Sequence, residues 1–559
     1  MWIRYPRTAH LPWSPGATAD DVRLADLDGL ARREVVVTEK LDGENTTLYR
    51  DGVHARSLDS AHHPSRAWVK ALHGAVAARI PAGWRVCGEN LFARHSLAYD
   101  DLDSWFYAFS VWDGDRCLGW DETVRFARTL GIPVPRVLWR GVFDERAVRG
   151  LRLDLSRHEG YVVRTVDGFE RDAFAQRVAK WVRREHVRTD RHWMLGPVVP
   201  NGRGVAGALW DVRAGLAVDV PGLVAAVGAG DTGAVARLEM PDRDGDARLA
   251  GVLAALLHEV PRTRLLSRLV PWGMPLARRV ADLVGLCRVL HRSFPDDERR
   301  AGLVRLGVAV DVGVLHAVAR AVARGDEERD QVAWSALYAE DSGLLDADPL
   351  GWLRSGLRDA VGVGDVGDRC WAHAREAFAD GRVSTVAEAA ALTWRWRDGE
   401  FPRLVVMCGP AGSGKSTFVH GLDGVDVVSL DDLRAARGSR ADQRANGDVL
   451  REGLRRLDAA LARGGTVVWD ATSLNRPQRS VLRDVADRHG ALVTHAVLVV
   501  DEDEAARRNA GREHRVPAEV VAAQWARFSP PYPGEAHRTW YVDRDAAVAD
   551  VAGSLGGEA

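Results

Sequence analysis

The 559-residue sequence has little cysteine, and its five cysteines are widely scattered, at Cys87, Cys117, Cys287, Cys370 and Cys408. This spacing gives no cysteine cluster of the kind that binds zinc and fits a reducing compartment. The sequence also lacks any run of about 18 apolar residues, so it predicts no membrane span. Its first residues, MWIRYPRTAHLPWSPG, have neither the apolar core nor the small-residue cleavage site of a signal peptide. We therefore expect a soluble, cytoplasmic protein.

An excess of charge of either sign is missing as well. The formal net charge is −2, with 28% charged and 46% hydrophobic residues. The basic residues are mostly arginine, the side chain best shaped for bidentate contacts with phosphate. Net charge therefore argues neither for nor against a nucleic-acid partner, and only local clusters of charge could decide this.

The length predicts two to four domains, because one hydrophobic core does not grow to 559 residues. Residues 1–195 alternate short β-like runs with helical stretches, residues 196–398 have Ala, Leu, Val and Arg at helical spacing, and residues 399–559 open on a new β-run. We expect an α/β multidomain protein. Its parts are an α+β catalytic domain, a helical middle domain and an α/β domain with a parallel sheet.

The middle region lacks the motifs of a phosphatase or phosphodiesterase. Residues 200–395 contain no adjacent His-Asp pair, no pair of HxT motifs and no DxDGT-like segment. His258, His291 and His316 lie in apolar helical stretches, where a histidine of the core or its boundary is expected. We assign no chemistry to this region.

A phosphate-binding loop is predicted in the last third of the chain. The segment LVVMCGPAGSGKSTFVHGL places GxxxxGK[ST] between an apolar strand and a helix. Backbone N–H groups of such a loop approach the phosphates, its lysine reaches the β- and γ-oxygens, and its serine binds magnesium. The predicted nucleotide-binding residues are Gly409, Gly412, Gly414, Lys415, Ser416 and Thr417, with Ser416 also a metal ligand.

Three segments after this loop indicate the acceptor. VVSLDDLR places Asp431 and Arg434 beyond a strand end, where a carboxylate can take the proton of an attacking hydroxyl and an arginine can hold a phosphate. VVWDATSLNRPQR places three polar side chains after another strand, Asp470, Thr472 and Asn475. RRNAGREHRVP then offers arginines on a predicted helical lid.

These residues resemble the polynucleotide 5′-hydroxyl kinases, although Ser473 stands where that family more often has asparagine. The resemblance implies that Asp431 is the general base, that Arg434 holds the acceptor phosphate and that Arg512 is the lid arginine. It also implies an acceptor-side role for Asp470.

A second nucleotide site is predicted near the N-terminus, where KLDGEN lies between two β-runs. A lysine can form a phosphoramidate with the α-phosphate of ATP once it has lost its proton, which burial and nearby cations promote. Lys40 is the candidate nucleophile. Asp42 is a candidate nucleotide contact, Asn45 can contact the nucleotide sugar or a metal, and Arg56 can hold a phosphate of the acceptor or the nucleotide.

An ordered series of residues after Lys40 supports this prediction. They supply a carboxylate for the ribose, an aromatic face for the adenine, a carboxylate for a metal and a cation for the α-phosphate, and they are Glu89, Phe109, Glu159 and Lys180.

The series resembles the ATP-dependent RNA ligases, a branch of the lysine-adenylating nucleotidyltransferases, over about residues 35–185. The resemblance implies an ATP-grasp-like ligase domain in which Lys40 carries AMP, Glu89 and Phe109 hold adenosine, Glu159 binds metal and Lys180 drives loss of pyrophosphate. The last motif has a single lysine in RVAKWVR, so Arg177 and Arg183 are open candidates for the missing cation.

Together the two resemblances imply RNA end repair, with ATP and Mg²⁺ or Mn²⁺ as cofactors. The C-terminal domain would phosphorylate a 5′-OH end, and the N-terminal domain would join the 5′-phosphate to a 3′-OH through lysyl-AMP and RNA-adenylate. RNA with 5′-OH and 3′-OH ends is the expected partner, cleaved tRNA being one candidate, and a separate phosphatase or phosphodiesterase could heal the 3′ end.

Other functions stay open at this point. One is a damage sensor that binds RNA ends with one degenerate catalytic site. Others are a DNA-end kinase and ligase, or a small-molecule kinase fused to a DNA-joining or capping nucleotidyltransferase.

Overall fold

The computed structural model describes residues 2–58, 62–184, 196–293, 295–437, 446–512 and 514–557. The chain divides into two compact units. The first comprises residues 1–229 and 242–249, and the second comprises residues 230–241 and 250–559. In the described part of the chain no single helix is long and apolar enough to cross a membrane. Only the pair Glu298–Gly307 and Val312–Val322, bent by 101°, meets both criteria when taken together.

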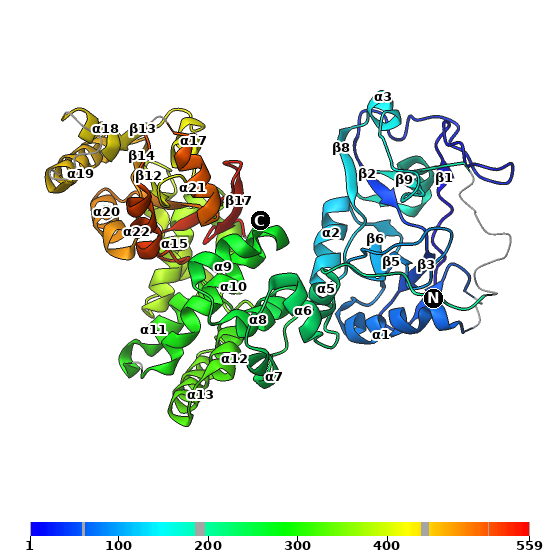
Figure 1. The fold of residues 1–559 in the computed structure, drawn as a ribbon, viewed down its shortest axis with the longest axis horizontal. Coiled ribbons are helices and arrows are strands. Elements are labelled where there is room, and N and C mark those ends of the chain that lie inside the picture. Colours follow the sequence, from blue (N-terminus) through cyan, green and yellow to red (C-terminus); the bar gives the residue numbers. More distant parts are fainter. Residues whose placement is uncertain are drawn as a thin grey trace. The chain divides into compact units, whose positions relative to one another are not determined.

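The first unit contains two sheets of mostly antiparallel strands (Figure 1). One has five strands in the order β1 (Ala9–His10), β11 (Val178–Val182), β9 (Gly160–Thr165), β2 (Glu34–Lys40) and β8 (Val137–Val142). Its short strand β1 pairs in parallel with β11, and the other pairs are antiparallel. β-Branched residues fill the centre of β2, where Val35, Val36 and Val37 are fully buried.

The second sheet of this unit has six strands in the order β10 (Phe169–Glu170), β7 (Arg116–Cys117), β6 (Phe106–Asp113), β5 (Trp84–Asn90), β3 (Glu44–Leu48) and β4 (Val53–Ala55). The helices α1 (Ala67–Val76) and α2 (Trp120–Thr129) pack on it through a shared apolar core. Shorter helices complete the unit: η1 (Pro64–Arg66), η2 (Ala77–Arg79), α3 (Glu145–Arg149), η3 (Arg171–Ala173), α4 (Phe174–Arg177), α5 (Gly207–Ala214) and α6 (Val220–Val227).

The P-loop sheet lies in the second unit. Its strand order is β13 (Asp426–Ser429), β14 (Thr466–Asp470), β12 (Arg403–Cys408), β15 (Leu492–Leu498), β16 (Arg538–Val542) and β17 (Val548–Ala552). Every pair is parallel except β16 with β17, which confirms the predicted parallel sheet. Its helices are α17 (Lys415–His420), α18 (Leu430–Ala435), α19 (Asn446–Ala462), α20 (Arg476–Arg488), α21 (Glu502–Ala510) and α22 (Ala518–Arg527).

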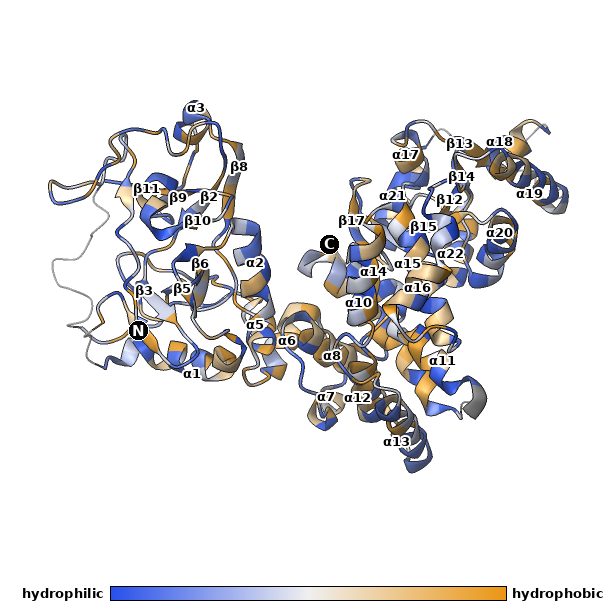
Figure 2. Cartoon of the chain, turned by 180° about the vertical axis from the view of Figure 1, so that it is seen from behind, coloured by the Kyte–Doolittle hydropathy of each residue, from blue (hydrophilic) through white to orange (hydrophobic). Residues whose placement is uncertain are grey.

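The helical middle region is confirmed as well. Besides α5 and α6, its helices are α7 (Thr232–Arg237), α8 (Gly245–Leu257), α9 (Arg262–Leu269), α10 (Met274–Leu286), α11 (Asp296–Gly307), α12 (Val312–Val322), α13 (Asp326–Asp341), α14 (Gly351–Val361), α15 (Asp365–Ala379) and α16 (Val386–Leu392), with the short helices η5 (Val270–Trp272), η6 (Cys287–His291) and η7 (Trp394–Trp396). The buried α12 is mostly hydrophobic and α20 mostly hydrophilic, as their colours in Figure 2 show.

Buried charged groups fix these helices to the P-loop sheet. Arg278 of α10 donates to Asp550 of β17 over 2.7 Å, and both side chains are almost fully buried. Arg375 of α15 donates to three main-chain carbonyl oxygens of the last strands and their loops, those of Gly553, Ala536 and His537. The helical region from Ala250 onward therefore shares one compact unit with the P-loop sheet. The division into three domains at residues 195 and 398 stays a prediction.

Candidate functional sites

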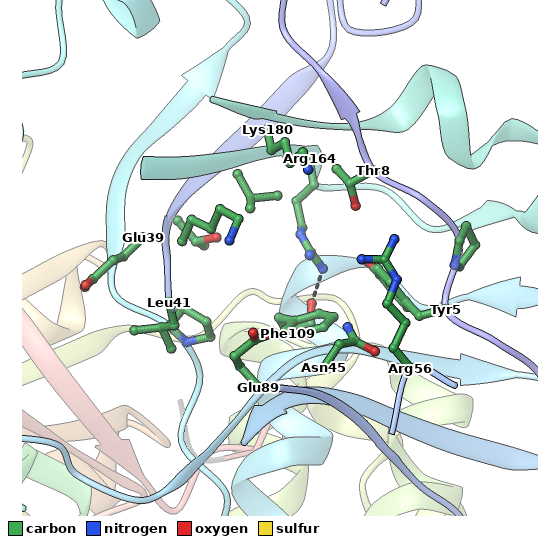
Figure 3. Close-up of a pocket in the computed structure, with 15 residues that line it drawn as sticks. Tyr5, Thr8, Glu39, Leu41, Asn45, Arg56, Glu89, Phe109, Arg164 and Lys180 are labelled. Atoms are coloured by element: carbon green, nitrogen blue, oxygen red, sulfur yellow. Dashed lines mark hydrogen bonds between the residues drawn. The ribbon is translucent and has the colours of Figure 1, made fainter. Parts of the chain in front are cut away.

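A cavity of about 180 Å³ lies between the two sheets of the first unit (Figure 3). One sheet contributes Lys40 from β2, Arg164 from β9 and Lys180 from β11. The other contributes Asn45 from β3, Glu89 from β5 and Phe109 from β6. The remaining lining residues are Tyr5, Pro6, Thr8, Thr38, Glu39, Leu41, Arg56, Pro135 and Val162. The structure thus gathers around one cavity most of the residues predicted for the N-terminal site.

Lys40 is the last residue of β2, and its ammonium forms an ion pair with Glu159. Glu159 directly precedes β9, in which Gly160 is the register partner of Lys40. A Cβ at Gly160 would lie only 1.9 Å from the carbonyl oxygen of Trp181, so this close packing of β9 on β11 requires glycine. The strand pairing alone therefore brings Lys40 and Glu159 together across 119 residues of sequence.

The charge state of Lys40 differs from the sequence-based expectation. Burial lowers the pKa of its ammonium, but the nearby carboxylates of Glu159, Glu89 and Asp42 raise it by more, so the net shift is upward. Lys40 is therefore held protonated in the free protein. A nucleophilic amine at this position requires that these carboxylates be neutralised when substrate binds.

Glu89 and Asn45 face each other as register partners in the β3–β5 pair. Burial raises the pKa of Glu89 to about 8, although the charge of Lys40 opposes this rise. One of its carboxylate oxygens accepts a hydrogen bond of 3.2 Å from the amide of Gly43. The buried Oδ1 of Asn45 has no hydrogen-bond partner among the described residues, which fits a polar group of a ligand in the cavity.

A β-bulge places Phe109 at the cavity. The pairing of β5 with β6 passes from Ser110 to Ala108, which leaves Phe109 as the extra residue. Its ring packs against Tyr5, with ring centroids 5.2 Å apart and planes at 69°. Arg164 donates a hydrogen bond to the carbonyl oxygen of Phe109, drawn as a dashed line in Figure 3.

Two residues that line the cavity, Arg164 and Tyr5, were not predicted from the sequence. The sequence could have indicated Arg164, because it is the one charged residue in the otherwise uncharged strand GYVVRT. No sequence pattern indicates Tyr5, because it lies in an irregular N-terminal segment before the first predicted strand.

Lys180 lines the cavity, whereas both arginines considered as a second cation bind elsewhere. Burial lowers the pKa of Lys180, and the charge of Lys40 lowers it further. Arg177 donates to the carbonyl oxygen of Gly29, and Arg183 donates to that of Leu155. Arg56, from the segment after β4, is the further cation at this cavity that the sequence had predicted.

Asp42 is held by the segment that follows β5. Its Oδ2 accepts a hydrogen bond of 2.8 Å from the amide of Leu97, and its own amide donates to the Tyr99 hydroxyl over 2.9 Å. Through these two hydrogen bonds, Asp42 fixes the turn after Lys40.

The phosphate-binding loop of the second unit connects β12 to α17. Gly412 and Gly414 have positive φ angles of 82° and 103°, and a Cβ on Gly412 would lie 2.2 Å from the carbonyl oxygen of Ala505. The Lys415 ammonium donates to the carbonyl oxygens of Gly409 and Pro410, at 2.9 and 2.8 Å. Burial lowers the pKa of Lys415 to about 8, against the attraction of Asp470.

The carboxylates of Asp470 and Asp431 both raise the pKa of Lys415 through their charge, against the larger effect of burial. Asp470 ends β14, where burial raises its pKa, Lys415 opposes the rise, and Asp431 adds to it. Asp431 is exposed in the first turn of α18 and forms an ion pair of 2.6 Å with Arg434. These contacts bring Asp431, Asp470 and Lys415 to the carboxyl edge of one sheet.

Thr472 and Asn475 have structural contacts in this unit. The carbonyl oxygen of Thr472 accepts the amide of Gly409 at 2.9 Å, and Asn475 caps α20 by accepting the amide of Gln478 at 3.2 Å. Ser473, between them, has a positive φ of 41°. Asparagine adopts this conformation more readily than serine.

Arg512 is exposed after α21, and its charge helps to lower the pKa of Lys415. Arg508, one helical turn earlier, lies close to the loop: one of its nitrogens would be 3.3 Å from a Cβ on Gly414. Of these two arginines, only Arg512 was predicted from the sequence. Ser416 and Thr417 occupy the first turn of α17, Ser416 half-buried and Thr417 exposed.

No group of three or more His, Cys, Asp or Glu side chains that could hold a metal occurs within the described ranges. Magnesium, however, commonly takes only one or two protein oxygens, with phosphate and water completing its shell. Glu159 in the first unit and Ser416 in the second carry oxygen donors of this kind.

The two regions match different protein families. Residues 33–182 match the RNA ligase family, and residues 404–531 match the AAA domain family. No curated protein matches the chain.

Solved structures resemble separate parts of the chain. A chain from "Structure of the Pnkp1/Rnl/Hen1 RNA repair complex" is 18% identical over 24% of this chain and 49% of its own length, with a TM-score of 0.21. Naegleria gruberi RNA ligase with PPi is 18% identical over 28% of this chain and 51% of its own, with a TM-score of 0.22.

A sugar kinase from Janibacter sp. is 27% identical over 26% of this chain and 86% of its own length, with a TM-score of 0.22. The chain spans about half the length of the RNA repair chain and of the Naegleria ligase. From the family matches and the sheets of the two units, the chain contains an RNA ligase domain in its N-terminal part and an AAA-type P-loop domain in its C-terminal part.

Proposed function

We propose that the protein repairs RNA ends, phosphorylating a 5′-OH with a nucleoside triphosphate and then sealing the 5′-phosphate to a 3′-OH. The observation that supports this proposal most is Lys40, which shares one cavity between two sheets with Asn45, Glu89, Phe109 and Lys180. Such a cavity offers a nucleophile for the α-phosphate, an aromatic face for the base and polar groups for the sugar.

In the ligase reaction, the Lys40 amine attacks the α-phosphorus of ATP, the P–N bond forms, and pyrophosphate leaves. The RNA 5′-phosphate then displaces Lys40 from AMP, and the 3′-OH attacks the resulting RNA-adenylate and releases AMP. Phe109 contacts the adenine, Glu89 and Asn45 contact the sugar, and Lys180 neutralises charge on the leaving pyrophosphate.

In the kinase reaction, Lys415 and the amides of the loop from Gly409 hold the β- and γ-phosphates. Asp431 takes the proton of the attacking 5′-hydroxyl, and Arg434 exchanges its ion pair with Asp431 for an acceptor phosphate. The 5′-oxygen bonds to the γ-phosphorus, the bond to the β-phosphate breaks, and the nucleoside diphosphate leaves. Arg512 neutralises the phosphoryl group during this transfer, and Asp470 acts on the acceptor side.

Glu159 and Ser416 are the ligands proposed for Mg²⁺ or Mn²⁺ in the two sites. A divalent ion there would neutralise phosphate charge and, at Glu159, would offset a carboxylate that keeps Lys40 protonated.

The test uses ATP labelled separately at the α- and γ-phosphates. We expect α-label bound covalently to the wild-type protein but not to Lys40→Ala, and γ-label on a 5′-OH RNA oligonucleotide with wild type but not with Lys415→Ala. Each variant serves as the control of the other, because its unaltered site should keep full activity.

The substrates in the test separate the other functions. GTP labelling of Lys40 would indicate capping, DNA ends preferred over RNA ends would indicate DNA repair, and γ-label absent from all polynucleotides would remove the polynucleotide kinase. Binding of RNA ends without covalent AMP would favour a damage sensor.

We also propose that cleaved tRNA is a substrate, that the protein is located in the cytoplasm and that a separate enzyme heals the 3′ end.

A further inference from the structure

A segment outside the matched RNA ligase region folds against the loop that joins two strands lining the cavity. This segment, residues 199–204, follows the family match, which ends at residue 182. The loop is residues 91–105, which joins β5, the strand of Glu89, to β6, the strand of Phe109. Both strands therefore depend on how this loop is held.

The 199–204 segment lies between the two limbs of this loop and bonds to each. On one side, the amide of Arg94 donates to the carbonyl oxygen of Val199 over 2.8 Å. On the other, the amide of Gly202 donates to the carbonyl oxygen of Tyr99 over 2.8 Å. A Cβ on Gly202 would lie 3.0 Å from the Cα of Asp100, which reflects how closely the backbones approach.

Asn201 is the centre of this arrangement and is only 2% exposed. Its Oδ1 accepts the amide of Tyr99 at 3.0 Å, and its Nδ2 donates to the carbonyl oxygens of Leu91 at 2.8 Å and Ala93 at 3.4 Å. Its own carbonyl oxygen accepts the indole N–H of Trp105 at 2.8 Å. One buried side chain thus fixes the distance between the two limbs.

The same contacts reach the turn after Lys40. The Tyr99 hydroxyl accepts the amide of Asp42 at 2.9 Å, and the amide of Leu97 donates to the Asp42 carboxylate at 2.8 Å. Leu41, which lines the cavity, packs in one apolar cluster with Leu91, Leu97 and Tyr99. The path from Asn201 to the residue that follows Lys40 therefore consists of direct contacts.

We infer that Asn201 is a positioning residue of the ligase site, acting through Tyr99 on Asp42 and through the 91–105 loop on Glu89 and Phe109. This inference rests on the proposed adenylation of Lys40. None of the hydrogen bonds that the described residues make with Asn201 involves a residue lining the cavity, so its effect is on geometry. Small displacements of reacting groups cost about 10- to 100-fold in rate.

The experiment measures the single-turnover rate of lysyl-AMP formation over a range of ATP concentrations in the full chain. Asn201→Ala should lower the saturated rate at least about 10-fold, and Tyr99→Phe should lower it less, because only the hydroxyl that accepts the Asp42 amide is removed. If both act on one path, the double variant should be no slower than Asn201→Ala alone. Val199→Ala is the matched control, since its side chain is 49% exposed and its carbonyl bond remains.

Hydrogen exchange at the Asp42 amide gives a readout that does not depend on activity. It should quicken in Asn201→Ala and Tyr99→Phe and stay unchanged in Val199→Ala, whose thermal unfolding should also match wild type. Unchanged exchange at Asp42, or a wild-type saturated rate in Asn201→Ala, would overturn the inference. Rate losses that multiply in the double variant would do the same. Absence of lysyl-AMP in the wild type would instead reject the proposed function, while exchange at Asp42 would still decide the role of Asn201.

Discussion

Lys40 and Glu159 form an ion pair where β2 ends and β9 begins, and the pairing of these two strands fixes their separation. The register partner of Lys40 is Gly160, whose missing side chain lets β11 pack against β9. The position of the proposed nucleophile thus depends on a backbone contact as much as on charge.

Gly160→Ala should destabilise the first unit. The added Cβ would lie 1.9 Å from the carbonyl oxygen of Trp181, so the strands must separate, at a cost of about 2 kcal/mol or more. Urea unfolding of the full chain should show a lower midpoint for the first unit, and lysyl-AMP formation should slow. Gly74→Ala, an exposed helix position with no atom within 4 Å of the new Cβ, should keep or raise that midpoint. Equal effects of the two changes would contradict the packing argument.

Arg164→Met should weaken ATP binding at the first site. The change removes a cation that lines the cavity. It also removes the hydrogen bond to the carbonyl oxygen of Phe109, so the ring of Phe109 is held less firmly. We expect a rise of about 10-fold in the ATP concentration that half-saturates lysyl-AMP formation. Kinase activity of the same preparation serves as the control and should be unchanged. A loss confined to the saturated rate would argue against this role.

Nucleotide binding at the P-loop should weaken as pH rises through about 8. Burial lowers the pKa of Lys415 to about 8 in the free protein, so below this pH the ammonium is present, and above it binding of a polyphosphate must recover a proton. Calorimetry with ADP between pH 6.5 and 9.5 should show a falling affinity and proton uptake at the high end. In Lys415→Met the change of ADP affinity with pH and the proton uptake should both disappear, which leaves weak and nearly pH-independent binding. An ADP affinity of the wild type that stays constant through pH 9 would refute the predicted titration of Lys415.

Asp550→Ala should unfold the second unit more easily, at a cost of about 3 kcal/mol or more. It leaves the buried Arg278 guanidinium without the carboxylate that lies 2.7 Å away. The unfolding transition that ADP shifts identifies this unit, and its midpoint should fall. Glu376→Ala breaks an exposed pair with Arg305 and should cost less than about 1 kcal/mol. Similar losses from both changes would show that the ion pair does not join α10 to β17 as described.

The same contacts predict how the chain can be divided. A fragment of residues 399–559 loses the helices that bind Asp550 and the carbonyl oxygens of the last strands, and it should be insoluble or partly unfolded. A fragment of residues 230–559 retains them and should fold. Circular dichroism and solubility of the two fragments distinguish these outcomes, and a cooperatively folded 399–559 fragment would contradict the prediction.

The sequence by itself determined the fold class and predicted the two nucleotide sites, because each rests on local patterns. GPAGSGKS between a strand and a helix predicts a phosphate loop, and KLDGEN with Glu89, Phe109 and Glu159 in order predicts a nucleotidyltransferase. The helical region was predictable from apolar spacing, and the parallel sheet from alternating strands and helices.

Tertiary structure alone decided the contacts between distant residues. Arg164 reaches the cavity through strand order and Tyr5 through an irregular segment, whereas Asn201 stays outside the cavity and holds a loop about 100 residues earlier by hydrogen bonds. The raised pKa of Lys40 also depends on three carboxylates that converge from different parts of the chain. Local patterns specify which chemical groups are present, whereas burial and strand register determine their distances and hence their charge states.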